Sequence, residues 1–236
     1  MSKSELRKAQ SPALTVVVPV LNEIQGLPQF CTRLATQITE EQCRVDVIFV
    51  DGGSVDGSEA MIMNYGFSCL SSERGRAKQM NLGAAAAKSP ILLFLHADSL
   101  LPSLGFKALL EGVKKHQWGR FDVSISGDAT IFFVIAWFMN WRSRLTGIAT
   151  GDQGIFVRRD VFEELRGFPE QDLMEDIALS TKLRKRSAPA CLRLKIITSG
   201  RRWQRRGICK TVILMWRLRL LYWLGVSADK LAKRYD

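Results

Sequence analysis

The segment LTVVVPVLNEIQGLPQFCTRLATQITEEQCRVDVIFVD (residues 14–51) decides the fold, because it contains two strand patterns separated by one helical pattern. Residues 14–20 and 45–51 are short apolar runs rich in β-branched residues, as expected for strands buried on both faces. Between them, apolar residues recur at helical spacing in residues 26–38. A strand–helix–strand unit with short links predicts a parallel sheet covered by helices.

The same alternation continues along the chain. We expect further strands at residues 67–72, 91–96, 120–126 and 191–199, and further helices at residues 58–66, 76–88, 130–145 and 173–186. A Gly-punctuated loop with a short strand and a short helix should occupy residues 150–168. Residues 120–126 alternate between apolar and polar side chains, which predicts a half-exposed strand. The predicted fold class is α/β, with a mostly parallel central sheet flanked by helices.

Length and composition indicate one folded domain with short additions at both ends. The chain has 236 residues, and we expect a disordered lead-in at 1–12, a domain at 13–205 and a basic amphipathic helix at 206–236. The net charge of +11 indicates an anionic partner, which could be nucleic acid, a membrane surface or a phosphorylated substrate.

The five cysteines argue against a disulfide framework and a structural zinc site, because their number is odd and no two form a CxxC pair. Reduced thiols are typical of a cytoplasmic protein. The polar first residues contain no apolar core of a secretory signal, so we expect a cytoplasmic location.

The apolar segment 207–225 raises the question of membrane contact. It is long enough to cross a bilayer, but Lys210, Arg217 and Arg219 interrupt it, and a charge near the bilayer centre is costly. Its mixture of Trp, Leu and Arg fits a helix that lies on the inner face of a membrane. A helix packed against the body of the protein fits equally well, so peripheral membrane association stays open.

Polar residues follow three of the predicted strands at the point where each strand ends. Asn22 and Glu23 follow the first strand, Asp51 the second, and His96 and Asp98 the fourth. In parallel sheets, ligands bind outside the carboxyl ends of the strands. A hard divalent cation such as Mg²⁺ or Mn²⁺ is held by one or two carboxylates together with substrate phosphates, so this rim suits a metal-assisted reaction of a diphosphate.

Several other site types are excluded by their motifs. The chain has no GxxxxGK[ST] loop and no GxGxxG after the first strand, which argues against a P-loop and a dinucleotide-binding fold. His96 and His116 are its two histidines, so a multi-histidine zinc centre is not available.

The ordered segments VPVLNE, DGGSVDGS, RGRAKQMNLGAAAA, LFLHADS, GDQG and MEDIALS resemble the family 2 glycosyltransferases of the GT-A fold over most of residues 14–200. Within that family the chain is most similar to small transferases named after radical-SAM/selenodomain association or arsenosugar biosynthesis. The resemblance implies an inverting glycosyltransferase that uses a nucleotide-diphosphate sugar and a divalent metal, Mg²⁺ or Mn²⁺.

The resemblance also implies roles for individual positions. The residues that match donor-binding segments are Pro19, Asn22, Glu23, Asp51, Gly53, Asp56, Arg76, Gln79 and Asp98. Asp98 matches the metal ligand of the family's D-x-D motif, whereas His96 stands where relatives carry the first Asp. Whether His96 touches the metal or only positions Asp98 is left open.

On the acceptor side, the resemblance implies that Gly151, Asp152 and Gln153 face the acceptor, together with Glu175. Asp176 matches the general base that takes the proton from the acceptor hydroxyl. The basic segment 201–206 resembles in position one that could hold the diphosphate. The acceptor itself, a small molecule or a lipid-linked molecule, is not specified.

Structural roles compete with each of these assignments. Asp51 could cap a turn, Asp98 could cap a helix at 103–115, and Glu175 could replace Asp176 as the base. Arg76 and Gln79 could lie on a solvated helix face, and Asp152 and Gln153 could be ordinary turn residues. The alternative function is a non-catalytic nucleotide- or polyanion-binding module of similar fold, although we expect no nucleic acid among the partners.

Overall fold

The computed structural model describes residues 12–127, 129–200 and 207–235. The first half of the chain contains β1 (Leu14–Val20), α2 (Leu27–Glu41), β2 (Val45–Asp51), α3 (Ser58–Asn64), β3 (Ser68–Ser71), α4 (Arg76–Ala86), β4 (Ile91–Phe94), β5 (Ser99–Leu100) and α5 (Gly105–Lys115). The second half contains β6 (Trp118–Ile125), α6 (Thr130–Thr146), the 3₁₀ helix η1 (Gly151–Gln153), β7 (Ile155–Arg158), α7 (Arg159–Glu164), α8 (Glu175–Arg186), β8 (Ala190–Thr198), α10 (Ile208–Trp223) and α11 (Ala228–Tyr235).

In the described part of the chain, eight strands form one sheet in the order β3-β2-β1-β4-β7-β6-β8-β5. The pairs β1–β2, β1–β4, β2–β3 and β6–β8 are parallel, whereas β7 runs antiparallel to β4 and β6, and β5 antiparallel to β8. The prediction of a mostly parallel α/β sheet flanked by helices is therefore confirmed. The carboxyl ends of β1, β2 and β4 meet at one edge of this sheet.

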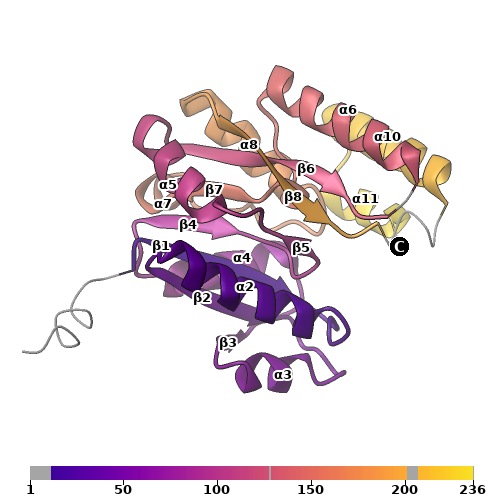
Figure 1. Ribbon diagram of the computed structural model, residues 1–236. Coiled ribbons are helices and arrows are strands. Elements are labelled where there is room, and N and C mark those ends of the chain that lie inside the picture. Colours follow the sequence, from indigo (N-terminus) through magenta and orange to yellow (C-terminus); the bar gives the residue numbers. More distant parts are fainter. Residues whose placement is uncertain (1–11, 128, 201–206, 236) are drawn as a thin grey trace, which may run out of the picture.

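Helices cover both faces of the sheet (Figure 1). On one face, α2 and α5 bury side chains such as Leu27 and Phe106 against the strands. On the other face, α4 and α8 do the same with Met80 and Leu179. Helix α4 approaches closely because Gly83 has no side chain: a Cβ there would lie 2.4 Å from a methyl group of Val17.

Strand β6 is buried almost throughout, which corrects the expectation of a half-exposed strand at 120–126. It pairs with β7 on one side and β8 on the other, and α6 packs across it. Its alternating polar residues are therefore buried, and they interact with each other and with α6. Strand pairing and helix packing are long-range contacts that the local pattern does not reveal.

Two helices replace the single C-terminal helix expected at 206–236. Helix α10 ends at Trp223, and the chain turns at Gly225, whose φ of 88° lies in the left-handed region that favours glycine, before α11 begins. Leu218 and Leu231 pack with Met174 next to α8, so these helices contact the body of the protein. No helix among the described residues is long and apolar enough to cross a membrane.

Two predicted segments lie outside the described residues. These are the lead-in, apart from Pro12, and the basic segment 201–206.

Candidate active site

The loop that follows β2 is held by the carboxylate of Asp51. Its Oδ2 accepts hydrogen bonds from the backbone N–H groups of Gly53 (2.9 Å) and Ser54 (2.8 Å). Asn22, at the end of β1, adds a second set: its N–H donates to Ser54 Oγ (2.8 Å) and its Oδ1 accepts from the N–H of Val55 (2.9 Å). These bonds join the ends of two neighbouring strands into one rigid rim.

The second carboxylate oxygen of Asp51, Oδ1, is buried and has no hydrogen-bond donor among the described residues. Gly53 beside it has a φ of 90° and open space where a Cβ would be, so the backbone is accessible there. A buried acceptor without a donor is costly, and a ligand N–H group would satisfy it.

The side chains of Asp56 and Gln79 form hydrogen bonds that stabilise this rim. Burial raises the pKa of Asp56, but hydrogen bonds from Ser58 and from the N–H of Ile24 outweigh burial and leave the pKa below its ordinary value. Gln79 is buried, and its Nε2 donates to the carbonyl oxygens at the ends of β1 (Val20, 2.8 Å) and β2 (Val50, 2.7 Å). Gln79 is therefore not on a solvated helix face.

Beyond the end of β4, His96 and Asp98 face a loop from the second half of the chain. His96 Nδ1 lies 3.7 Å from Asp152 Oδ1. A Cβ on Gly151 would lie 2.5 Å from the imidazole ring, so glycine is required for this close contact. Asp98 Oδ1 accepts from Ser99 Oγ (3.2 Å). The imidazole is thus fixed between the strand end and η1.

The N-terminus of α8 brings two carboxylates to the same place. Asp176 Oδ2 accepts from the N–H of Gly151 (2.8 Å), and its Oδ1 accepts from the N–H of Ile177 (2.7 Å). Glu175 is buried, and burial together with the charge of Asp176 raises its pKa, although Arg76 opposes this shift at 3.7 Å. Of the two carboxylates, Asp176 is the one tied to the Gly151 loop.

Gln153 does not face a ligand. Its side chain is fully buried and turns back to Thr150, whose N–H donates to Gln153 Oε1 at 3.2 Å. Gln153 therefore shapes η1 and does not line the cavity, while its buried Nε2 has no hydrogen-bond partner among the described residues. Its neighbours Gly151 and Asp152 remain accessible.

A cavity of about 430 Å³ brings together seven of the fifteen predicted site residues. Its polar lining includes Arg76, His96, Asp98, Thr150, Gly151, Asp152, Glu175, Asp176, Thr198, Ser199 and Arg219. Pro19, Asn22, Glu23, Asp51, Gly53 and Asp56 are not part of this lining and lie at or after the ends of β1 and β2. The predicted donor and acceptor residues thus fall into a strand-end rim and a cavity.

The donor set of the cavity fits a hard divalent cation that shares its ligands with a substrate. No three His, Cys, Asp or Glu side chains in the described ranges cluster closely enough to hold a metal by themselves. Asp98 nevertheless presents a carboxylate to the cavity, and Mg²⁺ or Mn²⁺ can be held by one or two carboxylates with phosphate oxygens and water.

Sequence reasoning did not assign two features of the cavity. Arg219 lies on α10 and lines the cavity, although in the sequence it only interrupts an apolar helix. The apolar wall comes from α6 and α10, whose sequences are apolar on several sides and so do not reveal which side is inward. The one available signal was the presence of arginine in an otherwise apolar segment.

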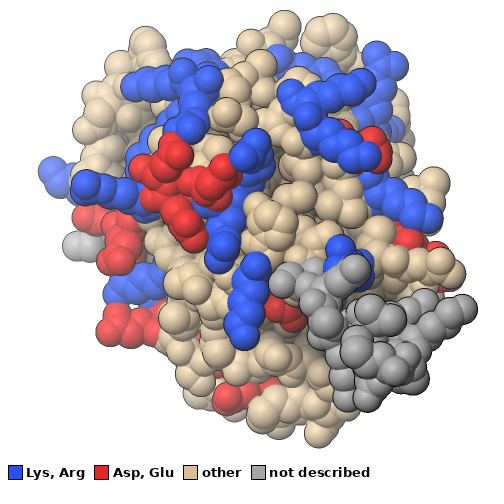
Figure 2. Space-filling model, turned by 90° about the vertical axis from the view of Figure 1, so that its left-hand side faces the viewer, with Lys and Arg blue, Asp and Glu red and all other residues tan. Residues whose placement is uncertain are grey.

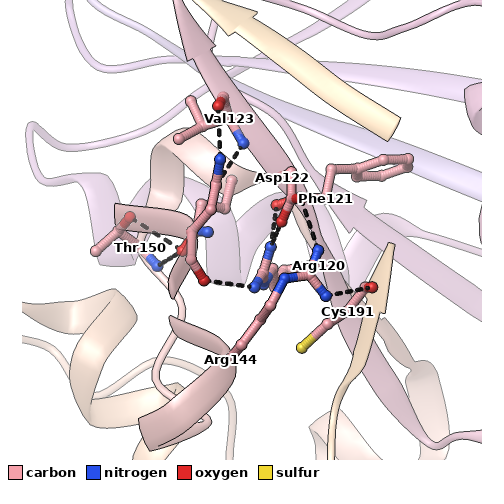
Figure 3. Close-up of polar contacts among 9 residues, drawn as sticks. Arg120, Phe121, Asp122, Val123, Arg144, Thr150 and Cys191 are labelled. Atoms are coloured by element: carbon pink, nitrogen blue, oxygen red, sulfur yellow. Dashed lines mark hydrogen bonds and ion pairs between the residues drawn. The ribbon is translucent and has the colours of Figure 1, made fainter. Parts of the chain in front are cut away.

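A buried polar network anchors α6 on β6 (Figure 3). Arg120 is fully buried and forms an ion pair with Asp122, which also binds Arg144 at 2.6 Å. Asn140 of α6 bonds to both backbone groups of Val123, with distances of 2.8 and 2.9 Å. This network fixes the helix that supplies one wall of the cavity.

The basic side chains give little support to a polyanion-binding surface. Figure 2 shows that on one face Lys and Arg alternate with clusters of Asp and Glu. Arg186 pairs with Glu164 and Arg158 with Asp160, while Arg184 donates to the carbonyl oxygen of Thr146. The basic end of α8 is thus engaged within the protein.

Three solved structures show the fold of this chain. The chain aligns with TarS 1–349 of S. aureus (TM-score 0.62, 17% identity, 79% of this chain and 60% of that one). It aligns with the mannosyltransferase PcManGT of Pyrobaculum calidifontis in complex with GDP-Man and Mn²⁺ (0.63, 21%, 89% and 61%). A third match is glucosyl-3-phosphoglycerate synthase of Mycobacterium tuberculosis in complex with Mn²⁺, UDP and glucosyl-3-phosphoglycerate (0.59, 18%, 83% and 75%).

The chain spans about 60% of the TarS fragment and of PcManGT. No curated protein matches the sequence. The family model described as "Glycosyl transferase family 2" matches residues 15–166, which is well over half of the chain. Together with the GT-A fold of its sheet, this match shows that the chain belongs to glycosyl transferase family 2.

Proposed function

We propose that this chain is an inverting glycosyltransferase that moves a sugar from a nucleotide-diphosphate sugar to an acceptor hydroxyl. The observation that carries the proposal is the single cavity lined by both Asp98 and Asp176. One carboxylate suits a metal-bound diphosphate and the other suits a general base. Family membership and relatives solved with UDP, UDP-GlcNAc or GDP-Man support this type of donor.

The strand-end rim would bind the nucleoside. The unpaired Oδ1 of Asp51 would accept an N–H group of the nucleobase, while Asn22 and Asp56 hold the loop around it. Pro19, Glu23 and Gly53 would form the remaining surface. Gln79 would act indirectly, because its amide nitrogen is occupied by the two strand ends.

Asp98 would hold Mg²⁺ or Mn²⁺, with His96 beside it. Relatives solved with Mn²⁺ or Mg²⁺ support this assignment. The bound cation would neutralise the charge that develops on the departing diphosphate. Arg76 would lie near the same diphosphate, since it lines the cavity and forms an ion pair with Glu175.

Asp176 would act as the general base. Two backbone N–H groups fix its carboxylate, and each oxygen retains a lone pair for the acceptor hydroxyl. The hydroxyl oxygen forms the new bond to the anomeric carbon while the bond from that carbon to the diphosphate oxygen breaks. The hydroxyl proton passes to Asp176, the nucleoside diphosphate departs, and attack from the opposite face inverts the anomeric centre.

We also propose a peripheral membrane contact through α10. Ile213, Trp216 and Trp223 of this helix are exposed, and Arg217 lies on it as well. Exposed aromatic residues beside basic ones suit the interface of an anionic bilayer. Flotation with anionic vesicles should retain the full chain, and exchange of Trp216 and Trp223 for Ser should release it.

Two variants test the reaction. Asp98→Ala should abolish Mn²⁺-dependent binding of UDP, UDP-GlcNAc or GDP-Man, measured by thermal shift. Asp176→Asn should leave donor binding intact but slow release of nucleoside diphosphate by roughly 10²- to 10⁴-fold, the range for loss of a general base. The control Asp160→Asn alters an exposed ion pair with Arg158 and should change neither. Full activity in both Asp98→Ala and Asp176→Asn would refute the assignment.

A further inference from the structure

The cavity has an apolar half that a nucleotide sugar does not need. Helix α6 contributes Val134, Phe138 and Met139, and helix α10 contributes Met215 and Trp216. The two helices lie side by side at the upper edge of Figure 1, and the rings of Phe138 and Trp216 are 5.4 Å apart. This half of the cavity is suited to an aliphatic chain or another apolar group.

The apolar half continues onto the outer surface. Phe133, Trp137 and Trp141 of α6 are exposed by about half or more of their area, as are Ile213 and Leu220 of α10. Exposed apolar side chains on the two helices that wall a cavity suit contact with an apolar molecule. If α10 lies on a membrane as proposed, such a molecule could enter the cavity from the lipid.

Two partly buried arginines, Arg142 of α6 and Arg219 of α10, lie on the same pair of helices. The Nε of Arg219, and the Nε and one Nη of Arg142, are inaccessible and have no hydrogen-bond partner in the described part of the chain. A buried N–H group without a partner costs roughly 1–3 kcal/mol. Because Arg219 also lines the cavity, a ligand acceptor atom could satisfy it.

The two guanidinium groups lie close enough for their positive charges to repel each other. Burial lowers the pKa of Arg142 to about 10 and also lowers the pKa of Arg219, and the charge of Arg219 adds to the effect on Arg142. Guanidinium groups nevertheless stay protonated in proteins. The carboxylates of Asp176 and Asp152 attract Arg219 electrostatically. A ligand anion placed beside both arginines would lessen the repulsion between them.

We propose that the acceptor is an anionic amphiphile whose charged group binds Arg219 and whose apolar chain lies between α6 and α10. The inference rests on the proposed function, because that function places the attacking hydroxyl at Asp176. Arg219 is near Asp176, so the anionic group lies close to the hydroxyl. Guanidinium groups bind phosphate and carboxylate oxygens in a fixed geometry, and Arg142 adds a second positive charge.

Three related probes separate the parts of this proposal. 1-Decanoyl-glycerol 3-phosphate carries a hydroxyl, a phosphate and a chain; glycerol 3-phosphate lacks the chain, and 1-decanoylglycerol lacks the phosphate. Binding is measured by calorimetry with the full chain, below the concentration at which the probes aggregate and without nucleotide or metal. We expect the complete probe to bind at least tenfold more tightly than either fragment. Equal binding of either fragment would overturn the proposal.

A pair of variants locates the phosphate. Arg219→Met keeps the length and apolar stem of the side chain and should weaken binding of the complete probe at least tenfold. The control Lys210→Met also removes a positive charge, from an exposed position of the same helix, and should leave binding unchanged. Equal loss in both variants, or in neither, would overturn the role of Arg219. The comparison of probes on the unaltered chain decides the proposal if Arg219→Met does not fold.

The two proposals fail in different ways. If UDP or GDP derivatives bind with Mn²⁺ but the complete probe does not, the acceptor inference is wrong and the transferase assignment stands. If the probe binds but no nucleotide sugar does, the transferase assignment is wrong and the amphiphile site stands as a binding site.

Discussion

The strand-end rim and the helix pair α6–α10 are held in opposite ways. At the rim, the loops after β1 and β2 are held by hydrogen bonds from backbone N–H groups: Asp51 accepts two within its own loop, and Asp56 and Asn22 each accept one from the neighbouring loop. The helix pair depends on packing and on the buried network of Arg120, Asp122 and Arg144 beneath α6 (Figure 3).

Under the proposed function, this difference would let one domain combine a fixed donor site with a variable acceptor site. The rim gains its rigidity from local hydrogen bonds and needs no help from the C-terminal helices. Helix α6 packs on β6, and α10 packs beside α8 and α11, so their inward side chains can vary without altering the hydrogen bonds of the rim. A glycosyltransferase built in this way could keep its donor and change its acceptor.

The largest expected effect comes from Asp122→Ala, which removes the shared partner of Arg120 and Arg144. Arg120 is fully buried, so its charge would lose its partner in a low-dielectric environment. Breaking a buried ion pair in this way costs about 3–5 kcal/mol in the free energy of unfolding. Urea denaturation measures the loss.

The control for this variant is Asp160→Ala, which breaks an exposed ion pair with Arg158 and should cost about 0–1 kcal/mol. Below the unfolding temperature of Asp122→Ala, nucleotide binding at the rim should persist while binding of the acyl probe falls. The distinction between the two regions would be refuted if both variants lowered the free energy of unfolding equally. It would also be refuted if Asp122→Ala lost nucleotide binding before binding of the acyl probe.

The rim and the His96–Asp98 part of the cavity could be predicted from the sequence, because their residues lie at or just after the ends of strands. Asp51, His96 and Asp98 come immediately after runs whose apolar character specifies buried parallel strands, and such strand ends converge. The cavity likewise brings Asp98 and Asp176 together, as the resemblance implied. Six strands, β1, β2, β3, β4, β6 and β8, were predicted to within two residues at each end, because their apolar patterns indicate strands.

The acceptor wall could not be predicted because its contacts join residues far apart in the chain. Arg219 resembled a charge on a surface helix, yet α10 packs next to α8 and places it in the cavity. Gln153 resembled a ligand-facing residue, but it bonds within its own turn. Strand β6 was expected to be half-exposed, and only the position of α6 makes it buried.

An intermediate effect is expected for Gln79→Ala, which tests whether the rim depends on its hydrogen bonds. The carbonyl oxygens of Val20 and Val50 would lose their shared donor, at a cost of about 1–3 kcal/mol. Because the loops that hold Asp51 and Asn22 begin there, affinity for UDP or GDP with Mn²⁺ should fall. Calorimetry measures the affinity.

Asn81→Ala is the matched control, since it lies on the same helix and also removes two hydrogen bonds, both to Phe168 (2.9 Å each). It should cost similar stability and leave nucleotide affinity unchanged. If both variants lower the affinity for the nucleotide equally, the hydrogen bonds of Gln79 are not what holds the rim in its binding geometry.

The smallest effect concerns Glu175 at the N-terminus of α8. Its buried carboxylate lowers the stability of the folded state when it is ionised. Burial and the neighbouring Asp176 raise the pKa of Glu175, so the folded state binds its proton more tightly than the unfolded state. Stability from this group is therefore present below its ordinary pKa and is lost as the pH rises from there through the raised value.

Glu175→Gln removes this loss, because the amide does not ionise. Melting curves between pH 4 and 8 should show a wild type that loses stability relative to the variant with rising pH, by at most a few degrees in Tm at pH 8. Glu111→Gln, on an exposed residue paired with Lys114, should follow the wild type. A variant less stable than wild type at pH 8 would mean that the ion pair with Arg76 outweighs burial. The N-terminus of α8 would then be held by a specific polar contact, as the rim is by its hydrogen bonds.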